Sequence, residues 1–325
     1  MRLVAIEEHW TTTELADALG ALPAERRDDS LALNDHGGAL ERLLDLGTAR
    51  IAAMDAQGID LQIVSLAPPG TGPLDPCDAV PLSRDLNDTA AAAVGRHPDR
   101  LRAMATLPLA EPSACAAELE RCVGAGFVGA MVYGRAGGRQ LDDPAFEELW
   151  EAAVALGVPI FIHPQIPPRE VRAASYSGFD DATELALATF GWGWHLEAAI
   201  SALRLIVRGT FDRHPGLQIV LGHWGELLPF WSDRTNSLAR VAGLQRAVSE
   251  VIRSNFYLTC SGMLNPTLLW HALEITTVDR LMFSTDYPFQ SPSSSDISSF
   301  LGEFGDVDER AAFAAGNATR LFRLG

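Results

Sequence analysis

The stretch LDDPAFEELWEAAVALGVPIFIH, residues 141–163, contains the two elements from which the fold is built. Pro144, directly after two aspartates, is typical of the first turn of a helix. Gly157 is typical of a helix end, and the apolar run 158–163 that follows it predicts a short buried strand. The stretch therefore predicts a helix followed by a strand, and this strand ends on a histidine.

Short apolar runs and helix-like stretches alternate in this way along all 325 residues. Strands separated by helices predict parallel β–α–β units, and eight such runs predict a closed (β/α)8 barrel, the TIM barrel of the α/β class. An open doubly wound sheet is the alternative, but no GxGxxG turn follows the first run, which weakens a dinucleotide-binding version of it. The eight runs span residues 3–9, 61–67, 101–107, 127–133, 158–163, 217–223, 255–260 and 280–286.

The composition of the chain limits its partners and its location. With 47% hydrophobic residues the chain can bury a large core, and we predict a single catalytic domain over residues 1–325 with a lid-like loop at about 164–192. The net charge of −17 repels phosphate backbones and anionic lipids, so we expect neither nucleic acid nor a membrane as a partner. The first residues carry charges where a signal peptide needs an apolar run, so we expect a cytoplasmic protein.

The sequence contains no lysine, and all 25 basic residues are arginine. This absence excludes Schiff-base catalysis, anchoring of pyridoxal phosphate and the Walker phosphate loop, because each of them needs a lysine. A carbamylated lysine that bridges two metal ions is excluded as well. A metal site in this chain is therefore expected to hold one ion.

Four of the predicted strands end on side chains that can bind a metal, and the C-terminal ends of barrel strands are where catalytic groups lie. Alternate residues of a strand point the same way, so Glu7 and His9 face together and Glu8 faces away. Any one of these histidines alone would more often be structural, but two carboxylates and two imidazoles suit zinc or manganese. We predict a site for one divalent ion, Zn2+ or Mn2+, with the ligands Glu7, His9, His163 and Asp286.

Further candidate residues follow the predicted ligands in the sequence. His223 ends the sixth run, three residues before Glu226, and could be a fifth ligand, a proton-transfer group oriented by Glu226, or a histidine packed under the rim. Arg234 could bind a substrate carboxylate, although its spacing alone favours a solvated arginine. Trp194 could form an aromatic wall or belong to the core, and His195 could line the pocket or cap a helix.

Long ordered stretches of the chain resemble the amidohydrolase-related decarboxylases. These include γ-resorcylate and dihydroxybenzoate decarboxylases and, more distantly, aminocarboxymuconate-semialdehyde decarboxylase. The resemblance covers nearly the whole chain. Its motifs are AIEEHW (5–10), LDDPAFEELWEAAVALGVPIFIHP (141–164), LRLIVRGTFDRHPGLQIVLGHWGELLPF (203–230) and FSTDYPF (283–289).

The resemblance implies a barrel of the metal-dependent hydrolase type with the four ligands named above. It also implies that His223 and Glu226 form an acid/base pair beside the metal and that Arg234 binds the substrate carboxylate. Members of the family are usually dimers or tetramers, so a homodimer or homotetramer is expected. The sequence departs from the family at 131–140, where an Asn-Gly turn is expected, and at 165–190, so the substrate itself is left open.

We predict non-oxidative decarboxylation of a hydroxy-substituted aromatic acid of the o-hydroxybenzoate kind. Asp286 would protonate the ring carbon that bears the carboxylate, and His223 with Glu226 could supply the proton. The alternative is a hydrolase that uses the same residues to open a lactone or an amide with a metal-bound water. The carboxylate of Glu7 makes the metal a weaker activator of water, which favours decarboxylation. A binding protein without catalysis predicts a degraded site, whereas every site position holds a competent residue.

Overall fold

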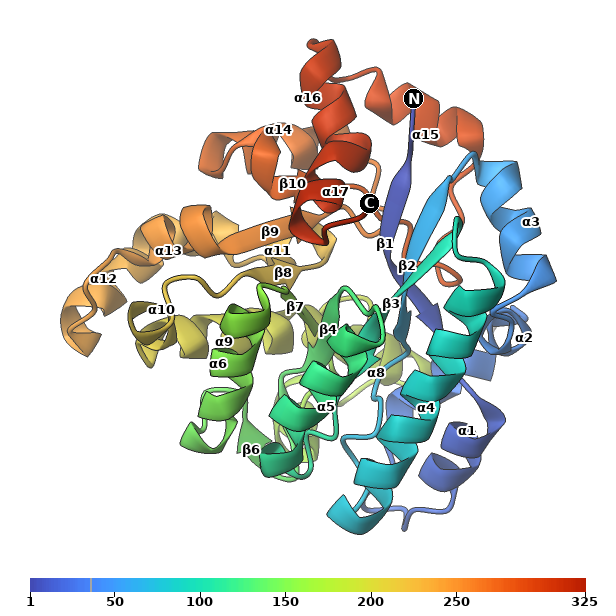
Figure 1. The fold of residues 1–325 in the computed structure, drawn as a ribbon. Helices are drawn as coiled ribbons and strands as arrows, with labels where there is room; N and C mark the ends of the chain where they lie inside the picture. Colours follow the sequence, from blue (N-terminus) through green and yellow to red (C-terminus); the bar gives the residue numbers. More distant parts are fainter. Residues whose placement is uncertain (36) are drawn as a thin grey trace.

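The computed structural model describes residues 1–35 and 37–325. His36, which we expect at the surface from its polar surroundings, lies outside the described residues. The main sheet has eight parallel strands in the order β1-β2-β3-β4-β7-β8-β9-β10 (Figure 1), each at one of the predicted runs. The strands are β1 (Val4–Trp10), β2 (Leu61–Leu66), β3 (Leu101–Thr106), β4 (Gly129–Tyr133), β7 (Ile160–His163), β8 (Ile219–Leu221), β9 (Phe256–Thr259) and β10 (Leu281–Met282).

Backbone hydrogen bonds connect the first strand of the sheet with the segment at the end of the last. The amides of Ile6 and His9 donate to the carbonyl oxygens of Phe283 and Tyr287, at 3.3 and 2.7 Å. These bonds close the sheet into a barrel, and the predicted (β/α)8 fold is confirmed. The departure that we noted at 131–140 forms a small antiparallel hairpin after β4, made of β5 (Arg135–Ala136) and β6 (Arg139–Gln140).

Two apolar clusters hold the barrel together. One cluster fills the interior of the barrel with side chains from the strands, among them Ile6, Phe161 and Met282. This interior cluster also includes Leu321 and Phe322, so the end of the chain covers the opening where the strands begin. The other cluster lies between the strands and the surrounding helices and includes Trp150. Each strand is therefore buried on both faces, one against each cluster. This explains why the strands appear in the sequence as nearly continuous apolar runs.

Helices follow the strands and surround the barrel (Figure 1). The described residues contain no helix long and apolar enough to cross a membrane. The helices are α1 (Thr13–Gly20), α2 (Ala39–Leu44), α3 (Thr48–Gln57), α4 (Pro76–Arg96), α5 (Pro112–Gly124), α6 (Glu147–Leu156), α7 (Arg169–Ser175), α8 (Asp181–Ala188), α9 (Gly193–Val207), α10 (Thr210–Arg213), α11 (His223–Glu226), α12 (Ser232–Ala242), α13 (Val248–Asn255), α14 (Pro266–Ile275), α15 (Ser294–Leu301), α16 (Val307–Ala311) and α17 (Asn317–Leu321).

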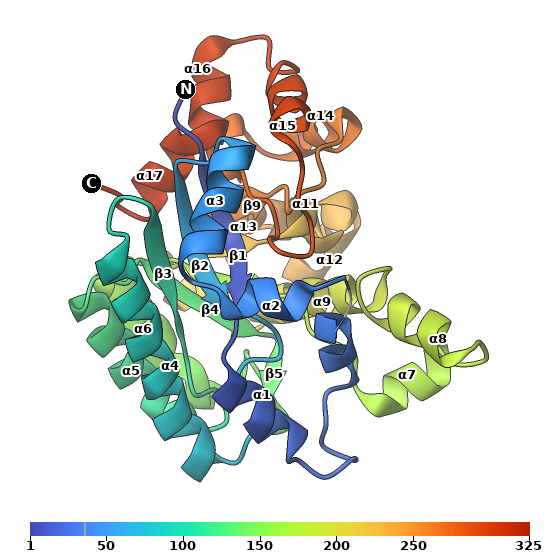
Figure 2. The ribbon, with the colours of Figure 1, turned by 90° about the vertical axis from the view of Figure 1, so that its right-hand side faces the viewer.

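The segment 164–192, expected as a loop, contains the helices α7 and α8. Figure 2 shows both helices projecting from the barrel on the side away from α4, α5 and α6. They enclose a small apolar cluster of their own, and Arg172 donates to Asp29 at 2.7 Å, which joins α7 to the segment after α1. Residues of both segments line a cavity of about 820 Å3. The role of this segment as a lid, and the organisation of the chain as one domain, stay predictions.

Candidate metal centre

The four side chains predicted as metal ligands lie together at the C-terminal ends of the strands. Glu7 and His9 come from β1, His163 ends β7, and Asp286 follows β10. Each offers one oxygen or nitrogen atom, and these atoms all lie within 4.8 Å of one another. We call these four residues the ligand cluster. Residues that are up to 279 positions apart in the sequence therefore form one compact group of two carboxylates and two imidazoles.

A β-bulge in β1 turns Glu7 into this cluster. The pairing of β1 with β2 shifts by one residue between Ile6 and Glu8, and Glu7 has a positive φ of 72°. Without the bulge, strict alternation from the buried Ile6 would place Glu8 inside the barrel and Glu7 outside it. The bulge instead lets Ile6 and Glu7 both face inward. Glu7 and His9 lie on the same side, as predicted, but a local irregularity produces this arrangement.

The carboxylate of Glu7 is fully buried, and its two oxygens have different surroundings. Oε2 accepts a hydrogen bond from Thr259 Oγ1 at 2.9 Å and a second one from Ser261 Oγ. Oε1 has no hydrogen-bond partner among the described residues and lies 3.8 Å from His163 Nε2. A buried carboxylate oxygen without a partner is costly, so this atom indicates that a cation belongs beside it.

The two imidazoles of the cluster also present nitrogen atoms to this point. The Nδ1–H of His163 donates to the carbonyl of Pro164 at 2.8 Å, which leaves the lone pair of Nε2 free. His9 Nε2 lies 3.2 Å from Asp286 Oδ1 and, like Glu7 Oε1, has no hydrogen-bond partner among the described residues. A backbone acceptor that fixes the other ring nitrogen is the usual arrangement for a metal-binding histidine.

Burial shifts the pKa of every member of the cluster towards its neutral form. It raises the pKa of Glu7 to about 8 and that of Asp286 to about 7. It lowers the pKa of His9 to about 3 and holds that of His163 well below its usual value. Neutral imidazoles are the form that binds metals, and a cation would stabilise the ionised carboxylates. The donor set therefore fits a single divalent metal ion.

Glu8 points away from the cluster into a buried polar network. Its carboxylate accepts from the backbone N–H of Thr285 at 2.8 Å and from Gln62 Nε2 at 3.1 Å. The other end of the Gln62 amide accepts from the buried guanidinium of Arg50, which also donates to the carbonyl of His9 at 2.5 Å. The network thus ties the backbone of two ligand-bearing segments together from behind the cluster.

His223 and Glu226 lie beside the cluster on α11, which is a turn of unusual conformation. Residues 223–227 all have positive φ, and only Gly225 among them is a glycine. Left-handed conformation costs roughly 1–2 kcal/mol for each non-glycine residue, so surrounding contacts must stabilise this turn. It brings Glu226 Oε1 to 2.7 Å from His223 Nδ1, and His223 Nε2 lies 3.9 Å from Asp286 Oδ2.

Opposing effects keep His223 and Glu226 ionised as a pair. Burial lowers the pKa of His223, but the charge and hydrogen bond of Glu226, together with the other nearby carboxylates, outweigh it and raise this pKa to about 10. Burial raises the pKa of Glu226, but His223 and His195 outweigh it and lower this pKa to about 2. The second partner, His195, was left open in the sequence analysis. It lies in the first turn of α9, and its Nδ1 is 2.7 Å from Glu226 Oε2.

The two predicted substrate-binding residues have different positions. Trp194 is half-buried on α9, and its ring centroid lies 6.4 Å from that of His163. Arg234 is exposed on α12 and makes no side-chain hydrogen bond or ion pair within the described ranges, so its role stays a prediction. Phe289, which the sequence analysis did not single out, lies with its ring centroid 5.9 Å from that of His9. Aromatic side chains therefore flank both imidazoles of the cluster.

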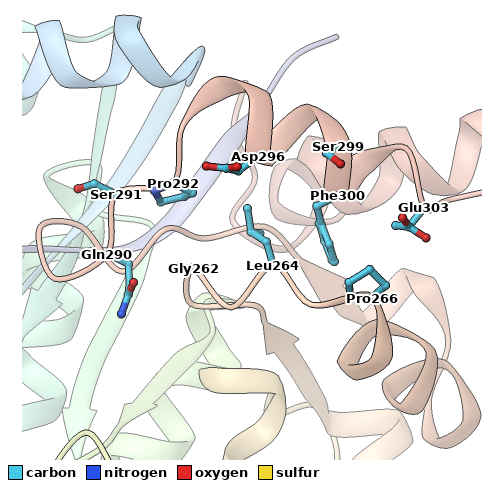
Figure 3. A pocket seen from close by; sticks show the side chains of 10 residues that line it. All are labelled: Gly262, Leu264, Pro266, Gln290, Ser291, Pro292, Asp296, Ser299, Phe300 and Glu303. Carbon is cyan, nitrogen blue, oxygen red and sulfur yellow. The ribbon is translucent and has the colours of Figure 1, made fainter.

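A cavity of about 460 Å3 lies near the same rim of the barrel. Figure 3 shows Gly262 and Leu264, which follow β9, opposite Gln290 of the loop after β10 and Phe300 of α15. No member of the ligand cluster lines this cavity. It is therefore a separate hollow behind the loops that carry Ser261 and Asp286.

Comparison with known proteins places the chain in a family. The sequence pattern of the amidohydrolase family matches residues 35–324. The chain belongs to the amidohydrolase family. Over 99% of its length this amidohydrolase is 35% identical to a γ-resorcylate decarboxylase of Polaromonas sp., of which it covers 98%. It is also 35% identical to decarboxylase orsB of Emericella nidulans, over 89% of this chain and 86% of that protein.

Solved structures of decarboxylases resemble this amidohydrolase over nearly its whole length. A 5-carboxyvanillate decarboxylase of Novosphingobium aromaticivorans, complexed with manganese and 4-hydroxy-3-methoxy-5-nitrobenzoic acid, has a TM-score of 0.90 at 30% identity, covering 99% of this chain and 96% of that one. A dihydroxybenzoic acid decarboxylase of Polaromonas sp., with bound manganese and 2-nitroresorcinol, has a TM-score of 0.85 at 33% identity, covering 99% and 97%. The family resemblance stated from the sequence motifs is confirmed.

Proposed function

We infer that this amidohydrolase is a metal-dependent, non-oxidative decarboxylase of hydroxy-substituted aromatic carboxylic acids. The observation that carries this function is the position of Asp286 between two groups. Its Oδ1 lies 3.2 Å from His9 Nε2 of the ligand cluster, and its Oδ2 lies 3.9 Å from His223 Nε2. A carboxyl group in this place can receive a proton from one side and donate it to a substrate held at the other. The relatives described above are decarboxylases of this kind.

The proposed reaction replaces the carboxylate of the ring by a proton. Asp286 in its protonated form donates to the ring carbon that bears the carboxylate. The bond from this carbon to the carboxylate then breaks, its electron pair restores the aromatic ring, and carbon dioxide leaves. The Nε2–H of His223 returns a proton to Asp286, while Glu226 holds the imidazole in place. One proton from solvent is consumed in each turnover.

The residues proposed to hold the metal are Glu7, His9, His163 and Asp286. When bound, the ion would supply a positive charge that stabilises the phenolate-like charge developing on an o-hydroxybenzoate ring. We propose Mn2+ as the first ion to test, since two solved relatives hold manganese. Zn2+ is the second candidate, because both ions accept two carboxylates and two imidazoles.

We propose that the aromatic ring of the substrate lies between Trp194 and Phe289. These two side chains flank the imidazoles of His163 and His9, and stacking on their rings would hold the substrate near Asp286. Arg234 is the proposed partner of the substrate carboxylate through a bidentate ion pair. Substitution of Arg234 by glutamine is expected to raise KM more than it lowers kcat if this assignment holds.

A screen of hydroxybenzoic acids tests the proposed reaction. The metal-reconstituted enzyme is incubated with ortho-hydroxybenzoates that differ in their other ring substituents, with Mn2+ and with Zn2+. We expect loss of the ultraviolet absorbance of the acid together with equimolar carbon dioxide. Opening of an aromatic lactone without gas release would support a hydrolase instead. The predicted cytoplasmic location and the predicted homodimer or homotetramer need separate tests, of which light scattering after size-exclusion chromatography is the simplest for the oligomer.

A further inference from the structure

The carboxylate of Glu226 is shared between two imidazoles. His223 Nδ1 lies 2.7 Å from Oε1, and His195 Nδ1 lies 2.7 Å from Oε2. The side chain of Glu226 has no exposed surface, whereas 16% of the His195 side chain is exposed. An ionised carboxylate only accepts hydrogen bonds, so both imidazoles donate to it through Nδ1–H. Among the described residues, each oxygen thus has one histidine as its partner.

The other side of the His195 ring is also fixed by neighbours. Its Nε2 lies 3.2 Å from the indole N–H of Trp194 and 3.1 Å from the carbonyl oxygen of Phe190. A neutral imidazole can accept from Trp194, and a protonated one can donate to Phe190. In either form the Nδ1–H of His195 remains available to Glu226. The contact between His195 and Glu226 is therefore independent of the proton on Nε2.

We propose that His195 is a positioning residue for the decarboxylation assigned above. Its Nδ1–H holds Oε2 of Glu226, so that Oε1 stays against His223 and the Nε2 of His223 stays directed toward Asp286. Without His195, Oε2 would be a buried acceptor with no partner, and rotation of the carboxylate toward another donor would release His223. The expected kinetic effect rests on the proposed function. The arrangement of the three side chains is observed independently of that function.

A second metal site is the competing explanation, because His195, His223 and Glu226 also have the composition of one. Two features oppose it. Both Nδ1 atoms are already hydrogen-bonded to the Glu226 oxygens at 2.7 Å, and each of these four atoms has a partner. A metal would have to replace both hydrogen bonds. The number of ions per chain therefore separates the two explanations.

Three variants test the role of His195. His195→Phe removes the donor but keeps the ring. His195→Asn keeps an amide N–H at the position of Nδ1, which faces Glu226, whereas His195→Gln carries its amide one atom further out, at the position of Nε2. The matched control is His214→Phe. His214 directly follows α10 and is hydrogen-bonded to another glutamate, Glu147, at 2.8 Å. The readouts are the metal content, kcat and KM, and the imidazole N–H proton resonances in the protein loaded with Zn2+, which is diamagnetic.

We expect His195→Phe to lower kcat roughly 10- to 100-fold, which corresponds to loss of one charge-assisted hydrogen bond. KM and the content of one ion per chain stay unchanged. His195→Asn restores most of kcat, and His195→Gln does not. In the spectrum of His195→Phe, the downfield N–H resonance of His195 disappears and that of His223 shifts, whereas His214→Phe leaves the His223 resonance in place.

Several outcomes overturn the proposal. These are an unchanged kcat in His195→Phe, an unchanged His223 resonance in that variant, or a second ion that the variant loses. If His195→Phe does not fold, the difference between His195→Gln and His195→Asn decides. If no aromatic acid is decarboxylated but the His223 resonance shifts as expected, the positioning role stands and the proposed function fails.

Discussion

Two groups of imidazoles and carboxylates lie side by side at the mouth of the barrel, and they differ in how their atoms are satisfied. In the ligand cluster, Glu7 Oε1 and His9 Nε2 are buried and have no hydrogen-bond partner among the described residues. In the neighbouring group, Glu226 gives each of its oxygens to a different histidine, His195 or His223. The same residue types therefore form a group with unpartnered buried donor atoms in one place and a closed hydrogen-bond network in the other, among the described residues.

The pKa values of the carboxyl groups also differ between the ligand cluster and the neighbouring group. Burial raises the pKa of Glu7 to about 8, whereas the two histidines lower that of Glu226 to about 2 despite its burial. His223 lies 3.9 Å from the first carboxylate without a hydrogen bond to it, whereas it is hydrogen-bonded to the second at 2.7 Å. The comparison indicates that the ligand cluster depends on a cation, whereas the His195–Glu226–His223 group supplies its own charge balance. Substitutions in the two groups should therefore affect metal content and turnover separately.

The largest expected effect is that of Asp286→Asn, because Asp286 contacts both groups. We expect kcat to fall about 10⁴-fold, since the amide cannot donate the proton that the ring carbon receives. Turnover is measured with the best substrate of the screen, and bound metal is measured in the same samples. A variant that keeps both its metal and its turnover would remove Asp286 from the proposed mechanism.

His223→Gln is expected to separate turnover from metal binding. The amide of glutamine cannot return a proton to Asp286, so we predict a fall in kcat of about 10²-fold. The metal content should stay at the value of the unsubstituted protein, as measured by atomic emission. Loss of the metal in this variant would show that His223 is a fifth ligand and that the two groups form one site.

Gly222→Ala is expected to act on the ligand cluster without removing any ligand. A Cβ atom at this position would lie 2.6 Å from Glu7 Oε1, the oxygen without a partner, and the φ of Gly222 is ordinary for alanine. Its next contacts are longer, 3.0 Å to Ser261 Oγ and 3.1 Å to Glu226 Oε1, so the largest displacement falls on Glu7. We predict that the affinity for Mn2+ falls roughly 10- to 100-fold, as is typical when the support of a metal ligand is disturbed. The control is Gly95→Ala on α4, where a Cβ meets nothing within 4 Å. Equal affinities in both variants would mean that Glu7 does not bind the ion through Oε1.

The smallest expected effect is on the pH dependence of thermal stability after chelation. In the folded protein the pKa of Glu7 is raised to about 8 and that of Asp286 to about 7, above their values of 4.5 and 3.8 in the unfolded chain. The stability that these protonated carboxyls contribute is therefore lost as the pH rises from about 4 to about 8. We expect the unfolding temperature of the metal-free protein to fall over this window and added Mn2+ to remove part of the fall.

Glu226 and Glu8 provide the references for this experiment. Because the pKa of Glu226 is lowered to about 2, its contribution is present above about pH 4.5 and is lost only as the pH falls below that value. Burial raises the pKa of Glu8 to about 8, and this part of the decline should not respond to metal. Calorimetry at several pH values, with and without Mn2+, measures the metal-dependent part. An identical profile with and without the ion contradicts the assignment of the ligand cluster.

The barrel and the composition of the ligand cluster could be predicted because they depend on regular patterns. Apolar runs alternate with helical stretches, and ligand-type residues such as His163 come where these runs end. The orientation of Glu7 depended on more than alternation. A bulge after Ile6 changes which residues face inward, and nothing in the run LVAIEEH marks it. The predicted pairing of Glu7 with His9 was obtained from the local spacing of the two residues, which the bulge leaves intact.

The role of His195 could not be predicted because it depends on a contact between distant residues. His195 meets Glu226 only because residues 223–227 form a left-handed turn, and non-glycine residues carry no local signal for this conformation. Phe289 and the helices α7 and α8 were missed for a similar reason, since tertiary packing sets their positions. Local patterns therefore predict which residues reach the rim, and the turns between them decide which atoms meet.

The metal content of three proteins tests the central difference between the two groups most directly. The unsubstituted protein, Glu7→Gln and Glu226→Gln are purified without chelators, supplied with Mn2+ and measured by atomic emission. We predict one ion per chain in the unsubstituted protein, none or a small fraction in Glu7→Gln, and one in Glu226→Gln. Two ions per chain, or a loss of the ion in Glu226→Gln equal to that in Glu7→Gln, would contradict this account. Either result would mean that the metal-binding cluster and the hydrogen-bonded group around Glu226 are not separate.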